Sequence, residues 1–159
     1  MNLNDLEISV IPCYKMQTEI LNFYMNCSRG VKLEESDQFV IAFQKGMIVG
    51  LVRLCLESDT YVLRTMQIHP HLQRLGIGTQ LLKRFESLLN ERGIKEIYCI
   101  PFEHLDSFYS KIGFTKIETY EAPEFLQERL LVFQRTRPTE TFIIMKKKNL
   151  NLSTDQVLQ

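Results

Sequence analysis

The fold and the ligand class of this chain are indicated most clearly by one stretch, Met66-Gln-Ile-His-Pro-His-Leu-Gln-Arg-Leu-Gly-Ile-Gly-Thr79. A β-rich run enters it and stops at His69-Pro70, because proline cannot donate a hydrogen bond to a sheet ladder. The chain then passes through Gly76 and Gly78 into a run whose apolar residues recur at helical spacing. The stretch is therefore predicted to be the end of a strand, a loop and the start of a helix.

The loop has the chemistry of an anion site. Helix N-termini leave backbone N–H groups without partners, and the aligned peptide dipoles place partial positive charge there. Glycines at 76 and 78 remove the Cβ atoms that would hold a phosphate away, and Arg74 adds a charge-assisted donor. The alternative is that these glycines serve only helix packing. The pattern favours a phosphate-bearing ligand.

Two common phosphate motifs do not fit. A P-loop needs Gly-Lys-Ser/Thr, whereas Gly78 is followed by Thr79-Gln80. A dinucleotide fingerprint needs a third glycine, and this chain has Leu81 at that position. Such a fingerprint also begins directly after its strand, whereas residues 69–75 separate the strand from Gly76 here. The ligand is therefore neither of these nucleotide classes.

Helices interleave with strands along the chain, some of them linked as hairpins. This order predicts an α/β (α+β) fold with a mixed sheet. Strands are expected at 6–10, 39–43, 47–56, 61–68, 94–100, 114–120 and 141–147. Helices are expected at 15–27, 78–92, 105–112 and 123–135. One domain is predicted over 1–147, with 148–159 as a flexible tail.

Composition limits the function classes. The chain has 159 residues and balanced charge, 19 basic against 19 acidic side chains, so no general field gathers nucleic acid or an anionic membrane. The longest apolar run, 47–52, is too short to span a bilayer. The N-terminus lacks a basic, apolar signal segment, so a cytoplasmic protein is expected.

The four cysteines and three histidines show no metal-ligand spacing, so no metal is predicted and the thiols are expected to be buried and reduced.

The run Gln73-Arg74-Leu75-Gly76-Ile77-Gly78 resembles the Q/R-x-x-G-x-G/A signature of the GNAT superfamily of acyl-CoA-dependent N-acetyltransferases. Downstream, Phe108-Tyr109-Ser110-Lys111-Ile112-Gly113-Phe114 is similar to the family's second motif, a tyrosine-bearing helix closed by Gly-Phe. The order of elements fits as well, so the resemblance covers most of the chain.

The resemblance implies a mostly antiparallel central sheet that is splayed between strands 4 and 5, with acetyl-CoA in the gap. The backbone of Met66, Gln67 and Ile68 would pair with the pantetheine amides as an added strand does. The pyrophosphate would be cradled by seven consecutive residues: Gln73, Arg74, Leu75, Gly76, Ile77, Gly78 and Thr79.

Tyr109 is the catalytic residue that the resemblance implies, as a hydrogen-bond or proton donor to the departing CoA thiolate. A tyrosine that only packs is the alternative. No general base is evident, because the strand at 61–68 carries no carboxylate. Candidates at strand or helix ends, each equally compatible with a solvated surface group, are Glu57, Asp59, Glu103 and His104.

Residues 121–140 form an insertion where the family usually has a short turn. Its helix has Phe125, Leu126, Leu130 and Phe133 on one face, and Leu131 and Val132 extend the apolar surface. We expect it to cover the acceptor side of the cleft or to form a homodimer contact, with a merely packed helix as the alternative. The lysines at 146–148 are interpreted as a solubilising end.

The leading hypothesis is an enzyme that transfers acetyl from acetyl-CoA to an amine of a small molecule or peptide by direct attack. A covalent route through Cys99 lacks an evident adjacent base. The competing hypothesis is a domain that binds acyl-CoA as a sensor or scaffold without turnover.

Overall fold

The computed structural model describes residues 2–149, which form seven strands and four α-helices in two compact units, divided along the chain between Arg92 and Gly93. The part of the predicted tail beyond Asn149 lies outside the described residues.

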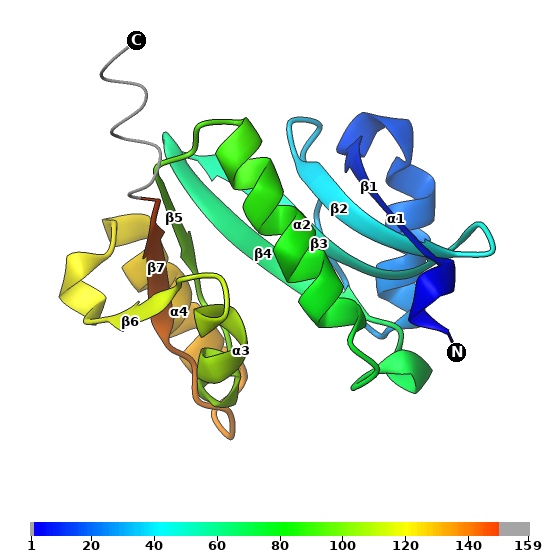
Figure 1. The fold of residues 1–159 in the computed structure, drawn as a ribbon. Coiled ribbons are helices and arrows are strands. Elements are labelled where there is room, and N and C mark those ends of the chain that lie inside the picture. Colours follow the sequence, from blue (N-terminus) through cyan, green and yellow to red (C-terminus); the bar gives the residue numbers. More distant parts are fainter. Residues whose placement is uncertain (1, 150–159) are drawn as a thin grey trace, which may run out of the picture. The chain divides into compact units, whose positions relative to one another are not determined.

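In the first unit, four consecutive strands form an antiparallel meander (Figure 1). They are β1 (Leu6–Pro12), β2 (Gln38–Gln44), β3 (Met47–Glu57) and β4 (Thr60–Ile68). A tight turn at Lys45-Gly46, both with positive φ, joins β2 to β3. The hairpin predicted there is confirmed, and Pro12 lies at the end of β1, where a missing N–H costs no ladder bond.

Two helices cover opposite faces of this meander: α1 (Gln17–Asn26) and α2 (Ile77–Glu91). Successive side chains of a strand alternate between the two faces, so the central strands must be apolar throughout. Residues Phe39 to Ala42 of β2 are accordingly all fully buried. Figure 1 shows α2 across the near face of the sheet and α1 behind it.

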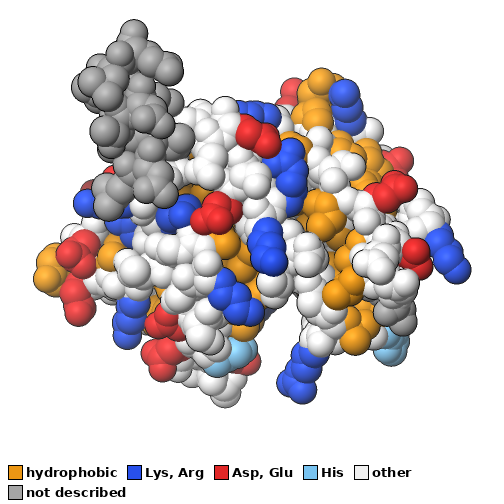
Figure 2. Space-filling model, in the orientation of Figure 1, with side chains coloured by type: hydrophobic (Ala, Val, Ile, Leu, Met, Phe, Trp, Pro, Cys, Tyr) orange, Lys and Arg blue, Asp and Glu red, His pale blue; other side chains and the backbone are white. Residues whose placement is uncertain are grey.

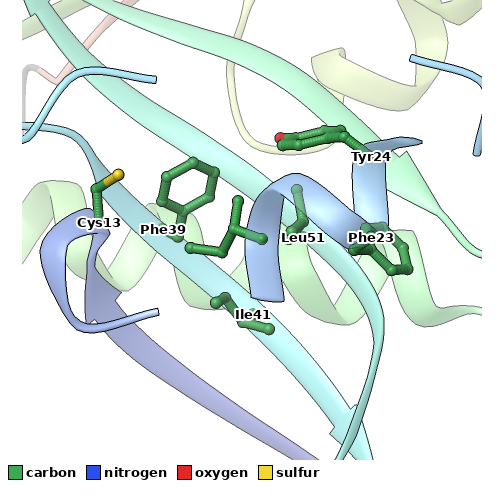
Figure 3. Close-up of a cluster of buried hydrophobic side chains, with 7 residues drawn as sticks. Cys13, Phe23, Tyr24, Phe39, Ile41 and Leu51 are labelled. Carbon is green, nitrogen blue, oxygen red and sulfur yellow. The ribbon is translucent and has the colours of Figure 1, made fainter. Parts of the chain in front are cut away.

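The core on the α1 face is a cluster that joins the helix to β2 and β3 (Figure 3). The ring of Tyr24 lies 6.3 Å from Phe23 and 6.5 Å from Phe39 between centroids, both in tilted or edge contacts. The other buried members of the cluster are Cys13, Ile20, Ile41 and Leu51. On the α2 face, the helix buries Ile77, Leu81, Leu82, Phe85, Leu88 and Leu89.

A buried ion pair joins the loop between α1 and β2 to strand β3. Arg53 of β3 lies 2.7 Å from the carboxylate of Asp37, and both side chains are almost fully buried. The same carboxylate accepts from the Glu34 N–H at 2.9 Å, and Arg53 also donates to the Lys32 carbonyl. The loop is thus fixed by charged hydrogen bonds as well as by the packing of Val31 and Leu33 against the core cluster.

The second unit contains a three-stranded antiparallel sheet in the order β5 (Glu96–Cys99), β7 (Ile144–Lys148) and β6 (Thr115–Ile117). Its helices are α3 (Asp106–Ser110) and α4 (Glu124–Thr136). The helix predicted in the 121–140 insertion is confirmed, with Pro123 as its N-cap.

Three strand lengths predicted for this unit are wrong. The predicted strand at 114–120 ends at Ile117, because residues Thr119–Glu121 turn into a 3-10 helix whose start is closed by the Glu121 carboxylate on the Glu118 N–H. The strand predicted from 141 starts at Ile144, and Phe142 makes only an isolated bridge with Phe102. The strand predicted at 94–100 covers only Glu96–Cys99.

The lysines at 146–148 do not form a solubilising end. Lys146 pairs with Glu96 at 3.2 Å, and the buried Lys147 ammonium donates to the Ile112 carbonyl. Lys148 alone is exposed. Strand alternation explains the difference, since 147 points to the opposite face from its neighbours.

Candidate functional site

The loop before α2 has the geometry of an open helix N-terminus. Gly76 is the N-cap residue with φ of 95°, in the left-handed region that favours glycine. It has no side chain to cap the first turn, so the N–H groups of Ile77, Gly78 and Thr79 have no capping oxygen from that position. The first turn also carries no acidic side chain. A 15-residue helix thus begins with donors and partial positive charge.

The loop itself is shaped by a second residue with positive φ. Arg74 has φ of 66°, which is uncommon for a residue with a side chain. Gln73, Arg74 and Leu75 are all exposed, so the guanidinium is accessible to a ligand at the helix start. The structure thus brings the predicted residues 73–79 together in one turn.

The packing behind this turn depends on a glycine that the sequence analysis missed. A Cβ on Gly50 of β3 would lie 2.9 Å from Ile68 Cδ1 and 3.2 Å from Ile77 Cγ2. Side chains from the first turns of α2 therefore pack directly on the β3 backbone at Gly50. Its signal was the glycine inside an otherwise apolar strand, which marks close approach of another element.

At the end of β4, the main-chain N–H and C=O groups of successive residues point alternately toward β3 and toward the opposite edge of the strand. His69 N donates to Val49 O at 2.8 Å, and Gln67 lies opposite Leu51. Because ladder bonds alternate in antiparallel pairs, the main chain of Gln67 faces β3 and that of Ile68 faces the other edge. The Met66 carbonyl accepts from Arg29 Nη1 at 2.9 Å and so is directed away from the ladder.

The side chain of Gln67 covers one of these groups, since its Nε2 donates to the Ile68 carbonyl at 2.7 Å. Of the three residues predicted to pair with pantetheine through their backbone, Gln67 is the one whose main chain faces β3.

Tyr109 lies in α3 of the second unit and is buried, with 6% of its surface exposed. Its ring makes edge contacts with Phe108 and Phe114 at centroid distances of 5.1 and 6.1 Å. Gly113, with φ of 95°, ends this helical turn and allows Phe114 to fold back under the tyrosine. The ring is thus held in one orientation by aromatic packing.

The residues considered as a general base differ in their contacts and in their backbone conformation. The Glu57 carboxylate pairs with Arg64 at 2.8 Å. The His104 ring stacks on Phe102 at 5.4 Å. Asp59 has φ of 61° in the turn between β3 and β4.

Cys99 is a poor nucleophile. It is almost fully buried, and burial raises the pKa of its thiol well above the ordinary value. The thiolate is the nucleophilic form of cysteine, so a thiol that stays protonated attacks a thioester poorly. The other thiols, Cys13, Cys27 and Cys55, are also free, and burial raises the pKa of each.

Within residues 2–149, no group of three or more His, Cys, Asp or Glu side chains is arranged to hold a metal ion. In the same part of the chain, no helix has the length and hydropathy needed to cross a bilayer. Figure 2 shows basic and acidic side chains interspersed over the visible face, without a field of one sign.

An open helix start beside a strand with outward main-chain groups is an arrangement suited to a phosphate-bearing ligand with an extended arm. Comparison with known proteins identifies the class. The profile of the acetyltransferase (GNAT) domain matches residues 15–126, which is most of the chain, so the chain belongs to the GNAT acetyltransferase family.

Similar proteins agree with this assignment. An uncharacterized N-acetyltransferase of Chlorobaculum tepidum is 23% identical over 93 residues, 58% of this chain. The match spans 59% of that relative's length. An acyl-CoA N-acyltransferase from Pseudomonas aeruginosa has a TM-score of 0.65 at 16% identity, over 89% of this chain and 99% of its own.

The N-acetylglutamate synthase of Neisseria gonorrhoeae, complexed with coenzyme A and N-acetyl-glutamate, has a TM-score of 0.61 at 14% identity. The match covers 89% of this chain and 35% of that one. At these identities the likeness shows the fold: the chain has the α/β fold of this family.

Proposed function

We propose that the protein is an N-acetyltransferase that moves an acetyl group from acetyl-CoA to a primary amine of a small molecule or peptide. The observation that carries the proposal is the uncapped start of α2 at Gly76, in a chain that belongs to the GNAT family. A helix start without side-chain caps is a ready site for the diphosphate of coenzyme A.

In this proposal the donor binds along the first unit. Residues 73–79 cradle the diphosphate through their N–H groups, and Arg74 adds a charged contact. Met66 and Ile68 are proposed to offer main-chain N–H groups to pantetheine, because their carbonyls already accept from Arg29 and from the Gln67 side chain. Main-chain recognition of this kind demands little of side-chain identity. No metal is part of the proposed chemistry.

Tyr109 is proposed to hydrogen-bond the sulfur of the departing thiolate. A phenol with a pKa of about 10 does not fully protonate a thiolate of about 8.5, so stabilising the developing charge is its main role. The rigid packing of the ring against Phe108 and Phe114 suits this role, since a donor that is already oriented loses no free energy to reorganisation.

The acceptor attacks the thioester carbonyl directly. The nitrogen–carbon bond forms, a tetrahedral intermediate collapses, and the carbon–sulfur bond breaks with the proton passing to the thiolate. The buried thiol of Cys99 speaks against an acetyl-cysteine intermediate. Holding both substrates together supplies much of the rate acceleration.

A second candidate function is binding of acyl-CoA as a sensor or scaffold without turnover. The observation that favours it is the engagement of Glu57 with Arg64, together with the absence of any carboxylate in residues 60–68. An ammonium acceptor with a pKa of about 10.4 needs a group to take its proton before it attacks.

The acceptor side is proposed to involve the 121–140 insertion. Leu126 and Leu130 pack inside the second unit, whereas Leu131 and Val132 are 53% and 48% exposed. That exposed pair is the surface we propose for the acceptor or for a homodimer contact. The free thiols and the balanced charge support a cytoplasmic protein without a nucleic-acid partner.

The test measures thiol release from acetyl-CoA across polyamines, amino acids, antibiotics and peptide N-termini. For the best acceptor, Tyr109→Phe is expected to lower kcat by at least about tenfold with unchanged CoA affinity. Tyr120→Phe is the matched control, because Tyr120 is 78% exposed. CoA binding without thiol release for any amine would favour the sensor; no CoA binding would overturn both proposals.

A further inference from the structure

Strand β4 is irregular where it approaches the proposed donor site. In the ladder with β3, Arg64 lies opposite Arg53 and Gln67 lies opposite Leu51. Two residues, Thr65 and Met66, therefore oppose the single Val52, which is a β-bulge. Thr65 has φ of 46°, a conformation that β-branched residues rarely adopt.

Such a bulge persists only when its surroundings hold it, because the strained residue would otherwise relax. Two side chains from α1 and the residues just after it provide that hold. The buried Tyr24 hydroxyl donates to the Thr65 carbonyl at 2.6 Å and lies 3.1 Å from Thr65 Oγ1. Arg29 Nη1 donates to the Met66 carbonyl at 2.9 Å and lies 3.2 Å from Gln67 Oε1.

Arg29 is itself fixed to this helix end, since its backbone N–H donates to the Tyr24 carbonyl at 2.9 Å. The two restraints therefore act from one rigid point on three consecutive residues of β4. Charged hydrogen bonds such as that from Arg29 are the stronger kind.

We propose that Arg29 is a positioning residue for coenzyme A, which holds the β4 bulge so that Met66 and Ile68 present their main chain to pantetheine. The inference rests on the proposed function. If the bulge relaxed into a regular ladder, every residue beyond it would shift by one position. The main-chain groups of Ile68 would then turn toward β3, and the edge offered to pantetheine would be lost.

The test separates the two halves of the donor. Calorimetry measures the affinity of full-length wild type and Arg29→Met for CoA and for adenosine 3′-phosphate 5′-diphosphate, which has the diphosphate but no pantetheine. Arg29→Met is expected to weaken CoA by about tenfold, the value of one charged hydrogen bond, and to leave the nucleotide unchanged.

Arg84→Met is the matched control, because Arg84 of α2 pairs with Glu91 at 3.0 Å and lies outside the proposed site. It should change neither affinity. Arg29→Lys, which keeps one charged donor, should lose less CoA affinity and remains measurable if the methionine variant does not fold.

Rescue provides the sharpest readout. Glycine adopts positive φ without strain, so Thr65→Gly in the Arg29→Met background should restore most of the CoA affinity. A residue that only stabilises the fold would show no such rescue. Equal CoA affinity of Arg29→Met and wild type, or parallel loss for both ligands, would overturn the inference while wild-type CoA binding upholds the proposed function. Wild type that binds no CoA would overturn both.

Discussion

Residues 2–92 and residues 93–149 are stabilised by different means. The first unit has strands of seven to eleven residues paired as a continuous meander, with a helix on each face. The second has strands of three to five residues, and beside its buried apolar side chains it contains a buried lysine, Lys147, which donates to the Ile112 carbonyl. Backbone ladders thus contribute more to the first unit than to the second, where the surroundings of Tyr109 are made by packed side chains.

The largest effect is expected for the buried ion pair of the first unit. Asp37→Ala leaves the charge of Arg53 buried without its partner, so we expect it to lower the free energy of unfolding by about 3–5 kcal/mol. Urea denaturation measures this loss. Asp37→Asn keeps an oxygen acceptor and should lose less. A loss below about 1 kcal/mol for the alanine variant would show that the loop at 27–37 is not fixed by this pair.

A smaller effect is expected where α2 meets β3. Gly50→Ala should lower stability by about 1–2 kcal/mol, because its Cβ would force apart Ile68 and the first turn of α2. It should also weaken CoA binding, since that turn is the proposed phosphate site. Gly30→Ala is the control, with nothing within 4 Å of its Cβ. Equal melting temperatures for the two variants would contradict the close approach.

The second unit is tested by two adjacent lysines. Lys147→Met removes the donor to the buried Ile112 carbonyl and should lower stability by about 1–2 kcal/mol. Lys148→Met, at an exposed position, should stay within about 0.5 kcal/mol of wild type. Thermal unfolding of both variants is sufficient, and similar values for the pair would restore the interpretation of these lysines as a solubilising end.

The smallest effect concerns Glu96, which accepts from the Tyr98 hydroxyl at 2.7 Å and pairs with Lys146. The Tyr98 hydrogen bond, helped by Lys146, holds the pKa of Glu96 below its ordinary value of 4.5. A lowered pKa stabilises the fold above the unfolded value, and that contribution disappears as the pH falls through the folded value.

Glu96→Gln should therefore cost no more than about 0.5 kcal/mol at pH 7, since solvent screens this half-exposed carboxylate. The difference from wild type should vanish as the pH is lowered below 4.5. Urea midpoints between about pH 3 and 7 measure it. A difference that persists unchanged at low pH would assign the effect to something other than ionisation.

Most of the first unit could be predicted from the sequence because its signals are long and periodic. The run Phe39–Phe43 and the helix with Leu81 and Leu82 match the structure to within a few residues. The second unit was less predictable: its strand ends depend on a reciprocal cap at Glu118 and Glu121 and on an isolated bridge at Phe102. Such contacts join specific atoms and leave no period in the sequence.

The candidate site likewise has one part that the sequence indicates and one part that it does not. Residues 73–79 could be proposed from the sequence because positive φ and an uncapped helix start require glycine at 76. The restraint of the β4 bulge by Tyr24 and Arg29 was missed, because it joins residues about 40 positions apart through a main-chain carbonyl. Sequence patterns report backbone demands well and long-range hydrogen bonds poorly.

The central claim is that the turn at residues 73–79 binds the diphosphate of coenzyme A. Isothermal titration of the full-length protein with CoA, beside Gly76→Val, tests it directly. Valine cannot adopt the φ of 95° found at this position, so the account predicts saturable binding to wild type and a loss of at least about a hundredfold in the variant. No heat with wild type at several temperatures, or equal affinity of a folded Gly76→Val, would contradict the account.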